Sequence, residues 1–288
     1  MRFCGAKKRL RSAVKRVSNH THIVLRVDPQ AVSDWSDDEV ADRWLRVFPG
    51  AMAQASSAEQ KQRVRMGLLS TPDRMEEIRK RLGSLSWFMR ALNEPIARMA
   101  NEEDNCSGRF WEGRFKCQAL LEPQAVVSAM GYVDLNPARA KMAPTLEESD
   151  HTSIKSRLES GGSILGKKSR LSHAGLKPVA GLDADALLNM TESSYLELVQ
   201  WTGEQLHPMK RGKLIPRSDL GEQPPELVLK LSKHSERWLK QVRGTESKYY
   251  RAIGSAEALM AKAAELGQRW MQGVSGERAW IILRSQTD

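Results

Sequence analysis

Polar and apolar residues alternate over positions 20–28 (HTHIVLRVD), and this period of two predicts a β-strand. Its two faces would carry Thr21, Ile23, Leu25 and Val27 on one side, and His20, His22 and Val24 on the other. The strand should end at Asp28-Pro29, because proline cannot donate a hydrogen bond to a strand ladder. The pattern therefore predicts two neighbouring imidazoles on one face of a strand.

Apolar residues at helical spacing follow this strand. Ser36 precedes an acidic turn, and the spacing after it predicts an amphipathic helix ending near Phe48. Residues 50–70 are polar and rich in alanine, and we expect no functional residues there. A long helix is predicted over residues 71–103, with a kink at Pro95.

A second strand and a second helix are predicted further along the chain. The strand covers residues 115–121, after a basic and aromatic loop punctuated by glycine. Pro123 suits the first turn of a helix, where its missing N–H does no harm. This helix should end near Asn136, because a residue that precedes a proline disfavours helical backbone angles.

A composition shift divides the chain. Residues 161–183 are rich in glycine, serine and lysine and are predicted to be a linker. We expect a catalytic domain over residues 1–160 and an all-helical domain over residues 184–288. The second domain contains three helical patterns, at residues 193–206, 225–242 and 246–271. Their apolar residues are interpreted as core.

The composition is that of a soluble globular protein. The chain has 288 residues, of which 40% are hydrophobic, enough for at least one core. No stretch approaches the roughly 18 unbroken apolar residues of a membrane span, and the first twenty residues lack a secretory signal. The three cysteines (Cys4, Cys106 and Cys117) are scattered, which favours a reducing compartment. We therefore expect a cytoplasmic protein with no membrane partner.

The charge balance points to an acidic partner. The net charge is +10, from 45 lysines and arginines against 35 acidic residues. Nucleic acid is the commonest acidic polymer that such a protein binds. The segment GRFWEGRFK interleaves cations with flat rings, the ingredients of a surface for single-stranded nucleic acid. The candidate DNA contacts are Arg109, Trp111, Arg114 and Lys116. The alternative is that Trp111 and Phe115 simply pack under a helix.

A candidate catalytic site combines the histidine strand with the helix after Pro123. His20 and His22 share a strand face, and Tyr132 and Asn136 lie four residues apart on one helical face. Two imidazoles and an amide oxygen suit Mg²⁺ or Mn²⁺ with positions left for phosphate oxygens, and Tyr132 would be the nucleophile. The alternative is that Tyr132 is an amphipathic surface residue and Asn136 only ends the helix.

Two sequence segments resemble a known family. VSNHTHIVLRVD together with MGYVDLNPARAKMA is similar to the single-tyrosine, histidine-hydrophobic-histidine (HUH) transposases of the IS200-like superfamily, and within it to the REP-associated tyrosine transposases. The segment between these motifs, GSLSWFMRALNEPIARMANEEDNCSGRFWEGRFKCQALL, also looks like that family. The resemblance covers residues 17 to about 160.

The resemblance implies a fold and a reaction. The expected fold is α+β, a ferredoxin-like antiparallel sheet with helices, followed by the helical C-terminal extension. His20 and His22 match the metal-binding pair, Tyr132 the nucleophile and Asn136 a third ligand. The expected activity is cleavage and rejoining of single-stranded hairpin or REP-type palindromic DNA through a 5′-phosphotyrosine intermediate, with Mg²⁺ or Mn²⁺. A homodimer is a further family-level expectation.

The chain departs from the family pattern in two places. Only nineteen residues precede His20, whereas the family has a strand and a helix there, so we expect the sheet to lack its first strand and the activity to be in doubt. Thr21 stands where the motif has a hydrophobic residue, a minor change because threonine is β-branched. The basic N-terminal segment KKRLRSAVKR is either an arm that binds phosphates or the remainder of a truncated N-terminal region, and we favour the truncation. The alternative function is a catalytically inactive DNA-binding remnant.

Overall fold

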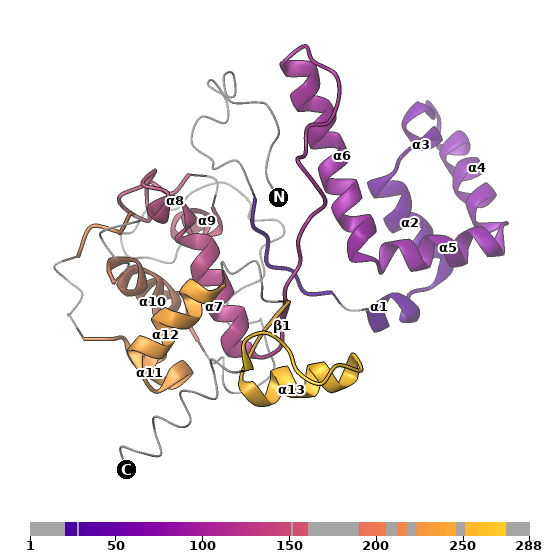
Figure 1. Cartoon of the computed structure of the whole chain (residues 1–288). Helices are drawn as coiled ribbons and strands as arrows, with labels where there is room; N and C mark the ends of the chain where they lie inside the picture. Colours follow the sequence, from indigo (N-terminus) through magenta and orange to yellow (C-terminus); the bar gives the residue numbers. More distant parts are fainter. Residues whose placement is uncertain are drawn as a thin grey trace. The chain divides into compact units, whose positions relative to one another are not determined.

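Helices form almost all the regular structure of the protein, as Figure 1 shows for the computed structural model. The structure describes residues 21–27, 29–150, 152–160, 190–205, 212–217, 223–245 and 251–274. These residues fall into two compact units. The first unit is Leu25–Phe115, and the second comprises residues 21–24 with the described residues from Lys116 onward. The predicted linker over residues 161–183 lies outside the described residues.

The first unit contains six helices: α1 (Pro29–Asp34), α2 (Asp37–Val47), α3 (Ala51–Gln54), α4 (Ala58–Leu69), α5 (Pro72–Leu82) and α6 (Leu85–Glu103). Its core consists of Val40, Ala41, Leu68, Met75 and Ile78. The predicted helix after Ser36 is confirmed, with a complete capping box between Ser36 and Glu39. Two backbone N–H groups at this helix start are thereby satisfied.

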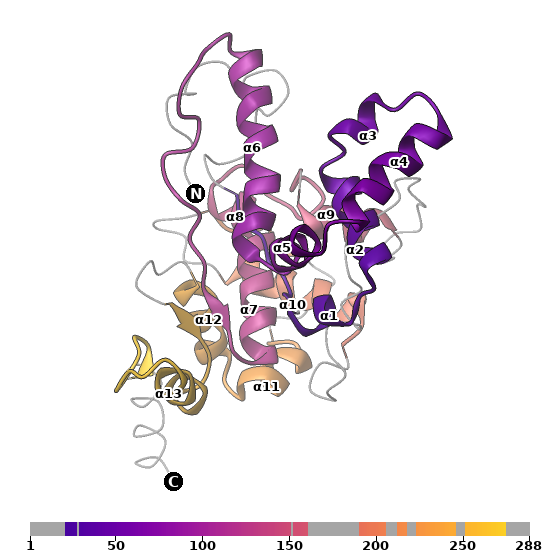
Figure 2. The same cartoon turned by 90° about the vertical axis from the view of Figure 1, so that its right-hand side faces the viewer.

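The single long helix predicted over residues 71–103 is wrong, because two helices, α5 and α6, occupy this range. Helix α5 ends at Leu82, and Ser84 takes an extended backbone conformation before α6 begins. Glycine at position 83 has a poor helix propensity, which places the break there. Pro95 lies inside α6, and Figure 2 shows that α6 turns away from the direction of α5.

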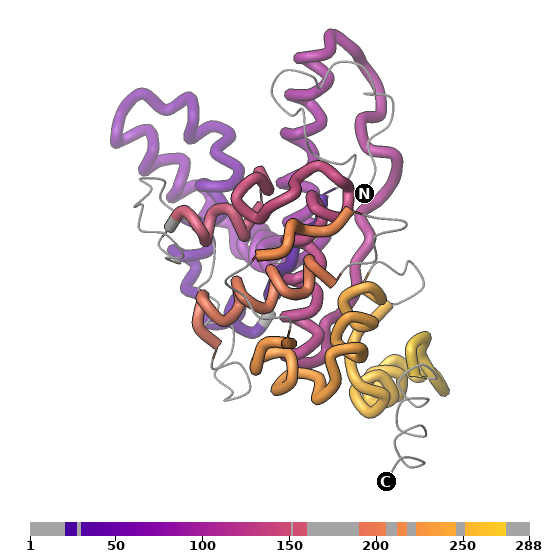
Figure 3. The backbone as a smooth tube through the Cα atoms, turned by 90° about the vertical axis from the view of Figure 1, so that its left-hand side faces the viewer, coloured from indigo at the N-terminus to yellow at the C-terminus, as the bar shows by residue number. Residues whose placement is uncertain are grey.

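The second unit contains the elements β1 (Ala119–Leu120), α7 (Pro123–Asp134), α8 (Asn136–Arg139), α9 (Ser153–Ser160), α10 (Glu192–Glu204), α11 (Glu226–Ser232), α12 (Ser235–Gly244), β2 (Ala252–Ile253) and α13 (Ala256–Glu265). Helices α10 and α12 pack against α7 (Figure 3). One buried cluster includes Val127 and Tyr132 of α7, Trp201 of α10 and Trp238 of α12. The predicted tyrosine helix and the C-terminal helices therefore share a core.

The expectation of a ferredoxin-like antiparallel sheet is wrong for this structure. In the described part of the chain the sheet consists of β1 and β2, which pair in parallel over two residues each. Residues 21–27 belong to neither a helix nor a strand. An alternating pattern becomes a strand only when a partner strand takes up its backbone hydrogen bonds. Ile23, Leu25 and Val27 are each more than 40% exposed, so the predicted apolar face is not covered.

Glycine at two positions allows close approach in the second unit. A Cβ at Gly203 in α10 would lie 2.4 Å from Leu214 Cδ1 and 2.7 Å from Leu135 Cδ2. A Cβ at Gly212 would lie 2.0 Å from the carbonyl oxygen of Ala138. The Gly212 N–H donates to the carbonyl of Arg139. The segment 212–217 thus packs directly on the end of α8.

Candidate functional site

Tyr132 lies in the last turn of α7, on the buried side of the helix. The helix begins at Pro123, as the sequence predicts, and eight of its residues are buried, Tyr132 among them. The Tyr132 side chain is 3% exposed and belongs to the core cluster of the second unit. A tyrosine at this position is therefore held in one place by packing, and the residues that touch it control access to its ring.

His22 contacts Tyr132 although the two residues are far apart in the sequence. Their ring centroids lie 5.2 Å apart, and the rings are nearly perpendicular at 84°, an edge-to-face arrangement. The neighbouring Val24 packs against the same core, which holds the His22 segment against α7. Nε2 of His22 is buried. The histidine motif and the tyrosine helix thus meet within one unit even though the strand that the sequence predicted is absent from residues 21–27.

Arg139 covers a face of the Tyr132 ring. Its guanidinium carbon lies 4.2 Å from the ring centroid, in cation–π geometry, and the residue is only 8% exposed. Arg139 is the last residue of α8, a short helix that follows α7 after Leu135. The phenol is therefore bordered by an imidazole and a permanent cation. Sequence reasoning missed Arg139, although its place seven residues after Tyr132, two helical turns away, would bring it to the same face.

Asn136 and His20 are the remaining predicted metal ligands. Asn136 is half-buried at the start of α8, immediately before Pro137, so the predicted end of the tyrosine helix is confirmed. His20 lies outside the described residues. No group of three or more His, Cys, Asp or Glu side chains that could hold a metal ion occurs in the described residues. His22 offers an imidazole nitrogen beside Tyr132, which is a suitable donor for a divalent ion.

Asp134 forms a buried hydrogen-bond cluster behind the site. It accepts hydrogen bonds from Ser153 Oγ at 2.5 Å, from the Ile154 N–H at 3.1 Å and from Tyr195 Oη at 2.7 Å. Asp134 is 1% exposed, and burial raises the pKa of its carboxyl above the ordinary value, against the opposing effect of the hydrogen bonds from Ser153 and Tyr195. Burial and the Asp134 charge raise the pKa of Tyr195 well above its ordinary value.

A second polar pair supports the same region. Arg157 of α9, 7% exposed at its side chain, forms an ion pair with Glu192 of α10 at 3.0 Å. The Asp134 cluster and this pair together join α7, α9 and α10, so the C-terminal helices fix the position of the tyrosine helix. No sequence motif indicated this cluster, because its members come together only in the fold.

The predicted DNA contacts lie at the boundary between the two units and in the first unit. Arg109, Trp111 and Arg114 follow α6 in the first unit, whereas Lys116 begins the second. Arg109, Arg114 and Lys116 are exposed, and Trp111 is half-buried. The alternative that Trp111 packs under a helix has support, because its indole Nε1–H donates to the Asn93 carbonyl of α6 at 2.9 Å.

Among the described residues, none of the helices is both long enough and apolar enough to cross a membrane. Cys106 and Cys117 are exposed free thiols. The chain matches no protein-family model, no curated protein and no solved structure with which it was compared.

Proposed function

We propose that this chain cleaves and rejoins single-stranded hairpin or palindromic DNA, with Tyr132 as the nucleophile. The observation that carries the proposal is the ring contact of 5.2 Å between His22 and Tyr132. The resemblance to REP-associated tyrosine transposases rests on two separate motifs, and these two residues belong to one motif each. The contact between His22 and Tyr132 supports a shared site rather than a chance match of two short sequence motifs.

The chemistry required of Tyr132 is a nucleophilic displacement at phosphorus. The phenol gives its proton to water, and its oxygen attacks the phosphodiester. The bond from phosphorus to the 3′ oxygen breaks, the 3′ oxygen takes up a proton, and the 5′ phosphate stays on Tyr132. A 3′-hydroxyl can reverse these steps and rejoin the strand, so no external energy source is needed.

Arg139 and His22 have distinct roles in this proposal. The Arg139 guanidinium, 4.2 Å from the Tyr132 ring centroid, favours the anionic form of the phenol. His22, together with His20 and Asn136, would hold Mg²⁺ or Mn²⁺. When bound, the ion supplies Lewis-acid polarisation of the phosphate oxygens. His22 also orients the tyrosine ring through its edge-to-face contact.

The reaction requires a change at the buried tyrosine. Because Tyr132 is 3% exposed, a DNA strand reaches its oxygen only when the side chains over it move. We place the reaction in the cytoplasm, in keeping with the exposed thiols of Cys106 and Cys117.

The test is incubation of the protein with labelled single-stranded hairpin DNA, with Mg²⁺ or Mn²⁺ and with EDTA. We expect a metal-dependent protein–DNA adduct that survives denaturation. Tyr132→Phe should abolish the adduct, and His22→Ala should reduce it strongly. Tyr195→Phe is the matched control, since it removes a phenol oxygen from the same core; it also removes a hydrogen bond to Asp134, so the adduct is normalised to folded protein by thermal melting and should then still form. An adduct that persists in Tyr132→Phe contradicts the proposal.

A second candidate function is a DNA-binding protein that has lost the chemistry. The burial of Tyr132 and the absence of an antiparallel sheet from the described residues favour it. Such a protein binds the hairpin but gives no adduct with any metal. Hairpin binding by fluorescence anisotropy, measured beside the adduct assay, separates the two functions.

A further inference from the structure

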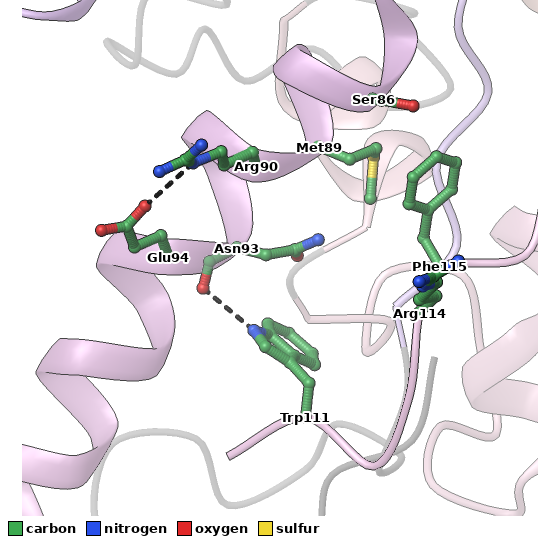
Figure 4. A pocket seen from close by; sticks show the side chains of 8 residues that line it. All are labelled: Ser86, Met89, Arg90, Asn93, Glu94, Trp111, Arg114 and Phe115. Atoms are coloured by element: carbon green, nitrogen blue, oxygen red, sulfur yellow. Dashed lines mark hydrogen bonds and ion pairs between the residues drawn. The ribbon is translucent and has the colours of Figure 1, made fainter. Parts of the chain in front are cut away.

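A groove in the first unit lies between α6 and the chain that follows it. Its volume is about 310 Å³, at the lower end of the range for small-ligand sites. It is lined by Ser86, Met89, Arg90, Asn93, Glu94, Trp111, Arg114 and Phe115. Figure 4 shows Met89 and Asn93 projecting from α6 toward the side of the groove that carries Trp111 and Phe115. The groove is thus lined by a thioether and two aromatic rings.

Trp111 is held in a fixed orientation. Its Nε1–H donates to the Asn93 carbonyl at 2.9 Å, as the dashed line in Figure 4 indicates. Phe110, 6% exposed, packs against it at 5.0 Å between ring centroids, nearly perpendicular at 80°. A half-buried indole with its N–H bonded and a perpendicular phenyl ring in contact is held rigidly, so little entropy is lost when a second flat ring stacks on the part of it that lines the groove.

Polar groups and charges surround this aromatic floor. Among the described residues, the side chains of Ser86 and Asn93 have no hydrogen bonds, so a hydroxyl and a carboxamide are available to the edge of a ligand. Arg114 is exposed and has no ion pair with any described residue. The one acid lining the groove, Glu94, is neutralised by Arg98 at 2.6 Å and by Arg90 at 3.5 Å. The groove margin is therefore net positive.

The long helix behind the groove is itself unusual. None of the nineteen residues of α6 is buried, and Phe88 and Met99 are 44% and 68% exposed. A helix that leaves these apolar side chains exposed, with an aromatic platform and the cation of Arg114 beside it, suits a ligand that has both flat apolar rings and negative charges. A single-stranded nucleic acid has this combination, and a duplex hides its rings.

We infer that this groove binds one unpaired base of single-stranded DNA, stacked on Trp111, with Arg114 on the adjoining phosphate. The inference rests on the proposed function in that the ligand is the strand which Tyr132 is proposed to cut. The amide of Asn93 and the hydroxyl of Ser86 reach the edge of the base. Stacking on Trp111 tolerates any base, so the groove contributes affinity for unpaired strands rather than sequence readout.

The test measures binding without cleavage, by fluorescence anisotropy of labelled oligothymidine in EDTA. Trp111→Leu should weaken binding by about 5- to 150-fold, the usual loss of one base–aromatic stack. Arg114→Ala should lower the slope of log affinity against log salt by about 0.7, the value for one lost phosphate contact on a single strand. Arg74→Ala is the matched control, since Arg74 is an exposed cation of α5 without an ion pair among the described residues, and it should leave the slope within 0.2 or so of wild type.

Photocrosslinking covers the case in which Trp111→Leu disturbs folding. Wild-type protein is irradiated with a strand carrying 5-iododeoxyuridine, and the crosslinked peptide is identified by mass spectrometry. Crosslinks at Trp111 or Phe115 support the groove. Crosslinks confined to other peptides, unchanged affinity in Trp111→Leu, or equal binding of a blunt duplex overturn it.

These outcomes are separate from those of the adduct assay. A Trp111-dependent affinity without any adduct at Tyr132 leaves the groove standing and contradicts the cleavage chemistry. A normal adduct together with unchanged affinity in Trp111→Leu leaves the chemistry standing and overturns the groove.

Discussion

The guanidinium of Arg139 lies over the ring of Tyr132, with its central carbon 4.2 Å from the ring centroid, and both residues are less than 10% exposed. A cation in a poorly solvated position interacts more strongly with a neighbouring phenol than the same cation in water. This pair therefore links the packing of the second unit to the chemistry proposed for Tyr132.

Replacing Arg139 tests this link. We expect Arg139→Met to slow adduct formation about tenfold or more, because loss of the cation disfavours the anionic phenol. Arg139→Lys keeps the charge but not the planar stack and should retain an intermediate rate. The measurement is single-turnover adduct formation, normalised to folded protein by thermal melting. Equal rates in all three proteins would show that Arg139 only fills space.

The Asp134 cluster predicts a pH-dependent stability. Burial raises the native pKa of Asp134 above its unfolded value, so the native state retains the proton to higher pH. The free energy of unfolding should therefore be greatest below the ordinary aspartate range near pH 4 and decrease as the pH rises through the native pKa. In Asp134→Asn the amide oxygen can still accept from Ser153 and the Ile154 N–H, and the amide NH₂ can donate to the Tyr195 hydroxyl, so the variant removes the charge and should remove this decrease.

Urea unfolding of wild type and Asp134→Asn between pH 4 and pH 8 checks this prediction by difference, which cancels the other titrating groups. Asp134→Ala is the companion variant. It leaves Ser153 and Tyr195 without their acceptor and should lose about 1–3 kcal/mol at every pH. If the free energy of unfolding of wild type instead increased relative to that of Asp134→Asn as the pH rises, the direction assigned to the Asp134 pKa shift would be wrong.

The close packing around Gly203 predicts that Gly203→Ala destabilises the protein. The added methyl would meet Leu214 and Leu135 at 2.4 Å and 2.7 Å, and overpacking of this kind costs about 1–3 kcal/mol. Gly67→Ala, in the interior of α4, is the control, because nothing lies within 4 Å of its Cβ position. It should gain up to about 1 kcal/mol from helix propensity. Opposite shifts in melting temperature are expected, and parallel shifts would contradict the packing.

The buried hydrogen bond between Trp238 and Thr202 predicts a third stability effect. Trp238 is fully buried, and its Nε1–H donates to Thr202 Oγ1 at 2.9 Å. Thr202→Val has nearly the same shape but leaves the indole N–H without an acceptor, so we expect a loss of about 1–3 kcal/mol. Thr202→Ser keeps the hydroxyl and should lose less. Chemical denaturation compares the two, and a larger loss in the serine variant would contradict this assignment.

Sequence patterns predicted the local elements better than the sheet. The Ser36 cap and Pro123 at the start of α7 depend on neighbours within one turn, and both helices form where the pattern places them. The strand expected over residues 20–28 depended on partners distant in the chain, and residues 21–27 form no strand. Local signals carry no information about whether such partners are present.

In the candidate site, too, residues within sequence motifs could be singled out beforehand, whereas residues that only the fold brings together could not. His22 and Tyr132 were singled out from the sequence, and the structure places their rings in contact. Asp134 carried no signal, because its partners Ser153 and Tyr195 come from α9 and α10. Buried polar clusters of this kind are visible only once the fold brings distant residues together.

The most direct test of the central claim is to identify the residue that carries DNA. The protein is incubated with single-stranded hairpin DNA and Mn²⁺, digested with protease and nuclease, and analysed by mass spectrometry. The account predicts a nucleotide attached through its 5′ phosphate to Tyr132, in an amount that falls sharply in His22→Ala. A nucleotide on another residue, or one on Tyr132 in undiminished amount without His22, would contradict a site shared by these two residues.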